Sequence, residues 1–242
     1  MGVFEKEFFI EFGDVGENNS LTAKGVLRFL QEIAVLASDK VGYGINNVDE
    51  THLVWILLNW KVQIFGNPIW NSKLKIRTWA RSARKLYSYR DFEMFDENNN
   101  LICIASSKWV LLNIETNSIE RISNEIIEKY EYIDKRVFPS DFVEKLEEPE
   151  NIDNSFSYIV QRRDIDTNHH VNNLNYLDFA YNAIPDDVYD STSFKNIEIM
   201  YKKSAVYREE LICLYSKTDE NTHVVTIKSK DLSKLHAIVK LY

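Results

Sequence analysis

The chain has 242 residues, of which 45% are hydrophobic and 13% aromatic, enough apolar material for one large domain or two small ones. Its 37 acidic residues outnumber the 29 basic ones and give a net charge of −8, which argues against a general nucleic-acid binder. No apolar run approaches the roughly 20 residues that a membrane-spanning helix needs, and the sequence does not start like a signal peptide, so we expect a cytoplasmic protein without a membrane anchor.

The first part of the chain predicts a strand, a long helix and then several strands. Apolar and polar residues alternate in EFFIEF, which is typical of a strand, and apolar residues recur at steps of three and four between 26 and 37, which is the spacing of a helix. Ser20 is a suitable N-cap for that helix, and the GYG stretch ends it. The strands expected next are 53–65, 73–82, 86–96 and 101–113, the last two forming a hairpin around ENNN, and a short helix follows near 123–130.

The second part repeats this plan in shorter form. Residues 136–150 carry two prolines and an acidic run, which indicates a linker. A strand is expected at 155–164, a helix at 171–185 that Pro185 ends, and four further strands at 194–205, 210–217, 223–230 and 235–242. Because strand, helix and antiparallel strands occur twice, the sequence predicts an α+β fold with two like domains, 1–135 and 151–242.

The two cysteines, Cys103 and Cys213, lie in apolar, strand-like runs. This pattern predicts buried, reduced thiols, with a disulfide or a nucleophile as the alternatives.

A polar cluster precedes the second long helix, in the stretch RRDIDTNHHVNNLNYLDFA. If the helix begins near residues 171–173, Asp166, Asn168 and His170 lie in the loop that leads into its N-terminus. Unpaired N–H groups and the helix dipole favour a developing oxyanion there. A His can titrate near neutral pH, an Asp can orient or activate it, and an amide can position water. The alternative is structural, with asparagines that cap the helix and solvated histidines.

Other catalytic and binding patterns are missing from the sequence. The five histidines show no metal-binding spacing such as HxxxH or HExxH, so we expect neither a metal nor a cofactor. The sequence also has no G-x-S-x-G motif and no glycine-rich phosphate loop.

The motif Asp166-x-x-x-His170-Val171-Asn172-Asn173-x-x-Tyr176 resembles the signature of hotdog-fold thioesterases of the hydroxybenzoyl-CoA type. With Asn168 added, it resembles more narrowly the acyl-acyl carrier protein thioesterases of bacteria and plant plastids. LRFLQEIAVLAS, WARSARKLYSYRDFEMFD and ASSKWVLLNIETNSIERI resemble the amino-terminal half of that family, so the likeness spans most of the chain. It implies two tandem hotdog domains, each a curved antiparallel sheet wrapped around a long helix.

The resemblance implies that the protein hydrolyses fatty acyl thioesters on acyl carrier protein, with Asp166, Asn168 and His170 as catalytic residues. His170 with Asp166 would activate water, Asn168 would hold the water or the carbonyl, and amides at 171–173 would bind the oxyanion. The neighbouring His169 is expected to be a bystander. A departure from the family is that Ser204 and Ala205 stand where the plant enzymes have a Glu-Cys pair, which excludes a covalent cysteine mechanism at that position.

The resemblance also implies that the first domain lines the acyl chain, and Trp55, Leu57 and Trp60 are candidate wall residues, ordinary core being the alternative. Two basic stretches are candidates for docking an acidic carrier protein. The first runs from Lys73 to Arg90 and includes Arg81 and Arg84, and the second consists of Arg162, Arg163, Lys202 and Lys203.

Three alternatives stay open at this stage: an acyl-CoA thioesterase, a hotdog dehydratase, and a non-catalytic protein that binds acyl thioesters, the last motivated by the missing acid at Ser204. Chain-length preference and homodimerisation are also open.

Overall fold

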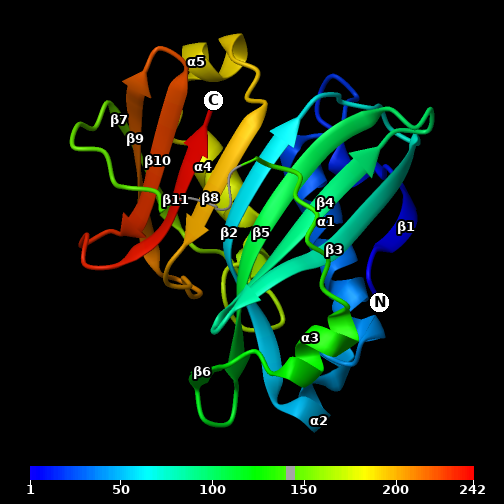
Figure 1. The fold of residues 1–242 in the computed structure, drawn as a ribbon. Helices are drawn as coiled ribbons and strands as arrows, with labels where there is room; N and C mark the ends of the chain where they lie inside the picture. Colours follow the sequence, from blue (N-terminus) through cyan, green and yellow to red (C-terminus); the bar gives the residue numbers. More distant parts are fainter. Residues whose placement is uncertain (140–144) are drawn as a thin grey trace. The chain divides into compact units, whose positions relative to one another are not determined.

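The computed structural model describes residues 1–139 and 145–242, so 140–144, within the expected linker, lie outside the described residues. The chain divides into two compact units, Met1–Val143 and Glu144–Tyr242 (Figure 1). No helix of the described residues is both long enough and apolar enough to cross a membrane.

Unit 1 contains an antiparallel sheet in the order β1-β3-β4-β5-β2, with β6 added on β5. The strands are β1 (Phe4–Phe9), β2 (Leu53–Ile64), β3 (Lys73–Arg84), β4 (Tyr87–Phe95), β5 (Leu101–Asn113) and β6 (Ser118–Glu120). The expected hairpin of β4 and β5 is confirmed, and Asp96 closes its turn because its Oδ1 accepts from the N–H groups of Asn98 and Asn100 at 2.9 and 2.8 Å.

The long helix of unit 1 is α1 (Ala23–Lys40), which packs on β3. Its N-cap is Thr22 rather than the expected Ser20, since the Thr22 hydroxyl accepts from the N–H of Gly25 at 3.0 Å. The residues spaced at three and four positions form its buried face, as predicted: Val26, Leu30, Ile33 and Ala37. The remaining helices are η1 (Phe12–Asp14), η2 (Ile45–Asn47), α2 (Val48–Thr51) and α3 (Asn124–Tyr130), the last at the expected place.

Unit 2 has an antiparallel sheet in the order β8-β11-β10-β9-β7. Its elements are β7 (Asn154–Ile159), η3 (Arg162–Asp164), α4 (Asn175–Tyr181), α5 (Asp186–Ser191), β8 (Asn196–Tyr201), β9 (Glu210–Asp219), β10 (Thr222–Ser229) and β11 (Leu235–Leu241). The five expected strands are all present. Helix α4 packs on β9, β10 and β11 and buries Leu177 and Ala180 completely.

The helix of unit 2 is shorter than expected. It begins at Asn175 rather than at 171–173, because Asn172 forms a turn in which its side-chain oxygen accepts from the N–H of Leu174 at 3.0 Å. It ends at Tyr181, and Asn182 donates its side-chain N–H to the carbonyl of Asp178 at 2.7 Å. The predicted α+β class is confirmed. A long helix was predicted in both parts of the chain, and it is present in unit 1 but not at 171–185.

Candidate active site

The polar cluster forms a tight turn between η3 and α4. Ile165 and Val171 form a β-bridge, and the N–H of Asp166 donates to the carbonyl of His170 at 2.8 Å. His169, with φ 62°, closes the turn by donating its N–H to the carbonyl of Asp166 at 3.1 Å. The Asp166 carboxylate also accepts from the N–H of Asn168 at 2.8 Å. The backbone therefore places Asp166 and His170 opposite each other, with Asn168 between them in sequence.

The three predicted site residues differ in their exposure. Asn168 and His170 are exposed and Asp166 is half-buried, while Asp164 and Val171 at the two ends of the turn are buried. Asn168 and His170 are thus accessible to a substrate, and Asp166 is held by its own turn. An imidazole, a carboxylate and an amide on one turn can accept a proton from water and orient it toward a carbonyl carbon.

The turn is fixed by hydrogen bonds to the segment that follows β8. The N–H of Val171 donates to the carbonyl of Ala205 at 2.9 Å, and the N–H of Ala205 donates to the hydroxyl of Tyr176 at 3.0 Å. Burial raises the pKa of Tyr176 to about 12, so the hydroxyl stays neutral. On the other side, the buried Asp164 accepts from the Tyr158 hydroxyl at 2.7 Å.

The expected oxyanion site at 171–173 is wrong for two of its three amides. The N–H of Val171 already donates to Ala205, and the N–H of Asn172 donates to the carbonyl of Asp164 at 2.8 Å. The helix also starts only at Asn175 and has seven residues, so its first turn does not include these positions.

Unit 1 contains the same turn with Gly16 and Ser20 at the places of Asp166 and His170. Gly16 donates to the carbonyl of Ser20 at 3.0 Å, and Asn19, with φ 60°, donates to the carbonyl of Gly16 at 2.9 Å. These residues lie 150 positions before Asp166, His170 and His169, and the 3₁₀ helices η1 and η3 that precede the two turns are also 150 positions apart. The backbone of this turn is therefore repeated 150 positions apart, and the carboxylate and the imidazole occupy these two places in unit 2.

The cysteines are buried free thiols, as predicted. Burial raises the pKa of Cys213 to about 12 and that of Cys103 further. Neither residue therefore supplies a thiolate near neutral pH. Among the described residues, no group of three or more His, Cys, Asp or Glu side chains is arranged to hold a metal ion.

The candidate wall residues of the acyl chain lie in unit 1. Trp60 and Leu57 are buried, and the Trp60 ring packs on Phe92 with ring centroids 5.3 Å apart. Trp55 is half-buried and donates its indole N–H to the Tyr130 hydroxyl at 2.9 Å. These contacts are those of core residues, and a role in binding the acyl chain stays a prediction.

Two domain models match the sequence: the acyl-ACP thioesterase N-terminal domain over residues 2–130, and the acyl-ACP thioesterase C-terminal domain over residues 147–239. The chain belongs to the acyl-ACP thioesterase family. The family prediction made from the motif at 166–176 is confirmed.

Two plant proteins are among the relatives of this chain. Oleoyl-acyl carrier protein thioesterase 2, chloroplastic, of Arabidopsis thaliana is 26% identical over 216 residues, which cover 83% of this chain and 59% of the relative. Oleoyl-acyl carrier protein thioesterase, chloroplastic, of Coriandrum sativum is 25% identical over 242 residues, covering 93% of this chain and 65% of the relative. The chain thus spans about three-fifths of the length of these curated relatives.

Solved structures of this family share the fold. An acyl-ACP thioesterase from Bacteroides thetaiotaomicron has a TM-score of 0.84 at 22% identity, and the 12:0-ACP thioesterase of Umbellularia californica has a TM-score of 0.86 at 21% identity. Each comparison covers 99% of this chain and 96% of the other. The predicted hotdog fold is therefore confirmed.

Three basic residues of β3, Lys73, Arg77 and Arg81, lie against acids. Lys73 and Arg77 form ion pairs with Glu7 and Glu5 of β1 at 2.7 and 2.5 Å. Arg81 is buried and lies 3.3 Å from Asp91, so this residue does not face a carrier protein, contrary to the expectation. The side chain of Arg84 lies outside the described residues.

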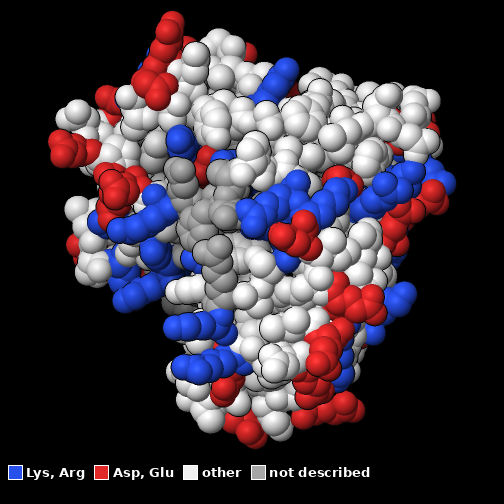
Figure 2. Space-filling model, viewed as in Figure 1, with Lys and Arg blue, Asp and Glu red and all other residues white. Residues whose placement is uncertain are grey.

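Basic side chains also gather on unit 2. In Figure 2, Lys and Arg cluster at the left of the view around the turn between β10 and β11. The lysines of this part are paired: Lys228 with Glu148 at 2.9 Å, Lys234 with Glu209 at 3.3 Å, and Lys230 with Glu210.

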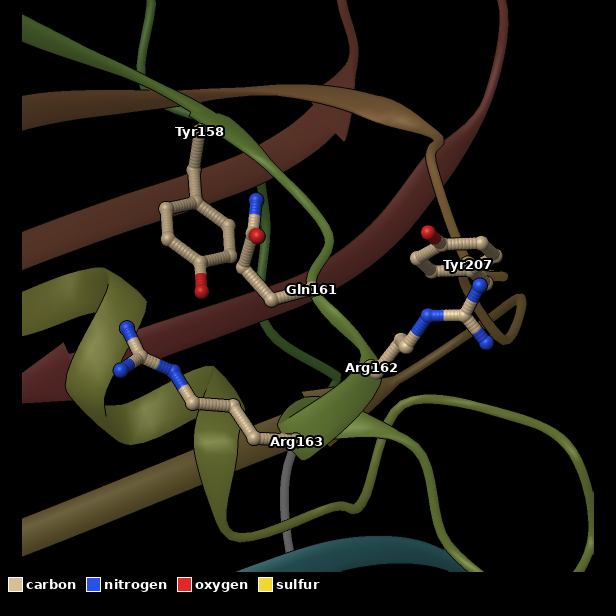
Figure 3. Close-up of a pocket in the computed structure, with 5 residues that line it drawn as sticks. All are labelled: Tyr158, Gln161, Arg162, Arg163 and Tyr207. Carbon is tan, nitrogen blue, oxygen red and sulfur yellow. The ribbon is translucent and has the colours of Figure 1, made fainter.

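A surface hollow of about 540 Å³ lies beside η3 and is lined by Tyr158, Gln161, Arg162, Arg163 and Tyr207 (Figure 3). The guanidinium of Arg162 lies 4.9 Å from the centre of the Tyr207 ring, and that of Arg208 lies 5.2 Å from it. Arg208, through a hydrogen bond, and Arg162 lower the pKa of Tyr207. The electrostatic potential here therefore favours an anion.

Proposed function

We propose that the chain hydrolyses fatty acyl-acyl carrier protein thioesters to a free fatty acid and the carrier thiol, the reaction that terminates fatty acid synthesis. The observation that carries the proposal is the turn that presents Asp166, Asn168 and His170 in a chain that both thioesterase domain models match. The equivalent turn of unit 1 has the same backbone but Gly16 and Ser20, which cannot accept a proton near neutral pH.

In the proposed reaction, a water oxygen attacks the thioester carbonyl carbon. The water proton passes to His170 or Asp166, the C–S bond breaks, and the proton returns to the departing sulfur. A thiol has a pKa of about 8.5, so it leaves with little acid assistance. Asn168 holds the water or the carbonyl oxygen by hydrogen bonds, which is the role that an exposed amide can fill without changing its charge.

The test is thiol release from acyl-carrier substrate by single variants. We expect His170→Ala to lower kcat by about 10²- to 10⁴-fold, the usual contribution of a general base. Asn168→Ala is expected to lower kcat by about 10²- to 10³-fold, as for the loss of one oriented donor.

The matched control is Ser20→Ala, which changes the unit 1 residue at the place of His170 and should keep the parental rate. If folded His170→Ala and Asn168→Ala proteins also release thiol at the parental rate, the site is wrong.

For the partner, we propose that the hollow at Arg162 and Tyr207 docks the acidic carrier protein. Two guanidinium groups lie on one aromatic ring there, and among the described residues neither Arg162 nor Arg208 forms an ion pair with a carboxylate. By contrast, Lys73 and Arg77 of β3 and the lysines of the β10–β11 turn have acidic partners. Arg162 also begins η3, four residues before Asp166, so a carrier bound there lies close to the turn.

A further inference from the structure

Glu209 and His236 form a buried carboxylate–imidazole pair next to the proposed catalytic turn. His236 lies on β11 and is 1% exposed, and Glu209 lies just before β9 with 12% of its side chain exposed. Nε2 of His236 is 3.4 Å from Oε1 of Glu209, and Nδ1 is 2.9 Å from the carbonyl oxygen of Lys203. No sequence pattern connects these residues, which are 27 positions apart.

The hydrogen-bond partners of the ring determine where its protons lie. A carbonyl oxygen can only accept, so Nδ1 must carry a hydrogen to bond Lys203. Nε2 faces Oε1 of Glu209 at 3.4 Å and makes no hydrogen bond among the described residues, so the hydrogen bond from Nδ1 is the one that holds the ring.

The groups that face Glu209 come from three parts of the unit. They are the His236 ring from β11, the Lys234 ammonium at 3.3 Å from the β10–β11 turn, and the N–H of Val206 at 3.0 Å from its own segment. The contact with Lys234 is solvent-exposed on the lysine side and adds little to a buried pair. The His236 ring and the N–H of Val206 are thus the main neighbours of the carboxylate.

The pair fixes both ends of the segment 202–209. His236 binds the start of the segment, through its ring to the Lys203 carbonyl and through its own carbonyl to the N–H of Lys202 at 2.8 Å. Glu209 binds the end, where its other carboxylate oxygen accepts from Val206. Between them lies the buried Ala205, which holds the turn through Val171 and Tyr176.

Two observations connect the pair to the proposed catalytic turn. Burial is the largest cause of the raised pKa of Tyr176, and the carboxylates of Glu209 and Asp166 both raise it further. Ser204, where an acid was expected from the resemblance, is exposed in the same segment next to Ala205.

We propose that Glu209 and His236 are positioning residues for thioester hydrolysis: through their bonds to its two ends, they fix the segment 202–209 against the turn that carries Asp166 and His170. This inference rests on the proposed function. Glu209 places a carboxylate in the segment in which Ser204 stands at the position of the expected acid. This carboxylate acts through Ala205 and does not touch the substrate.

The first experiment removes the Glu209 side chain and then restores its hydrogen bond without its charge. Glu209→Ala removes the acceptor for the N–H of Val206, and we expect kcat to fall about 10- to 100-fold with KM little changed, as for a displaced catalytic group. Glu209→Gln can still accept from Val206, so it should restore most of the rate.

The split of the effect between kcat and KM, together with the rescue by Glu209→Gln, separates positioning from a general structural role. A loss of stability alone lowers the melting temperature but leaves the kcat of the folded protein unchanged. The control Glu210→Gln removes the same charge one residue away, from an exposed pair with Lys230, and should keep the parental kcat.

The melting temperature of each variant reads folding independently of turnover. The proposal is overturned if Glu209→Ala lowers the melting temperature but keeps the parental kcat, or if Glu209→Gln loses as much kcat as Glu209→Ala. A parent that folds and releases no thiol would instead refute the proposed function.

Discussion

At the scale of single residues, the histidine doublet separates into two different roles. His169 has φ 62°, in the left-handed region that few non-glycine residues adopt, whereas His170 continues into the β-bridge of Val171. Asn19 occupies the same place in unit 1 with φ 60°. The backbone of the turn therefore explains His169 without any catalytic role.

This assignment predicts that His169→Asn keeps the parental hydrolysis rate. Asn is among the residues that tolerate the left-handed conformation, so the free energy of unfolding should change by no more than about 0.5 kcal/mol. His169→Val, which is β-branched, should lower it by about 1–2 kcal/mol. Denaturant unfolding and thiol release measure the two effects. A His169→Asn protein that is as inactive as His170→Ala would show that His169 takes part in the chemistry.

The sequence could predict the residues of the turn but not those around it. Asp166, Asn168 and His170 are neighbours in the chain, so their density and the motif were visible. Glu209 and His236 are brought together by the pairing of β11 with β8, which places His236 against the segment after β8. The proximity depends on strand register, which a single sequence does not specify, and Ser204 gave only an indication that an acid was missing.

At the scale of elements, the two helix starts explain why one helix was predicted well and the other was not. At Gly25 a Cβ would lie 2.7 Å from the carbonyl oxygen of Asp14, so α1 approaches the preceding turn closely and runs on from Ala23. In unit 2 the residue 150 positions later is Asn175, whose side chain donates to the carbonyl of Asp164 at 3.1 Å. Apolar spacing at 171–185 is the same for a full helix and for a short helix followed by turns, so periodicity alone could not distinguish them.

The close approach predicts that Gly25→Ala destabilises unit 1, although alanine normally favours a helix by roughly 0.5–1 kcal/mol over glycine. The added Cβ would also meet the Leu21 side chain at 2.8 Å, so the cost of overpacking, about 1–3 kcal/mol, should exceed that gain. Gly13→Ala is the control, because a Cβ there meets nothing within 4 Å. Thermal unfolding of both variants measures the difference, and equal midpoints would contradict the close contact.

At the scale of the whole molecule, the net charge of −8 is a poor guide to the partner. An acidic chain and an acidic carrier repel each other on average, yet association depends on where the charges lie. On β3, Lys73 and Arg77 are paired with acids of β1, and at the β10–β11 turn the lysines are paired with Glu148, Glu209 and Glu210. The hollow at Arg162 and Tyr207 is the place where positive charge is concentrated beside the turn.

Two neutralising variants can test whether distribution or net charge decides docking. Arg162→Gln and Arg77→Gln each remove one positive charge from the molecule, the first from the hollow and the second from an ion pair with Glu5. We expect Arg162→Gln to lower kcat/KM for acyl-carrier substrate by about tenfold, at the low end of electrostatic steering effects, and Arg77→Gln to leave it unchanged. Raising the salt concentration from about 0.1 to 1 M shortens the screening length from roughly 10 to 3 Å and should remove the difference.

With acyl-CoA, which lacks the acidic protein surface, Arg162→Gln should have a smaller effect. Equal losses in the two variants, or equal losses on the two substrates, would place the carrier elsewhere.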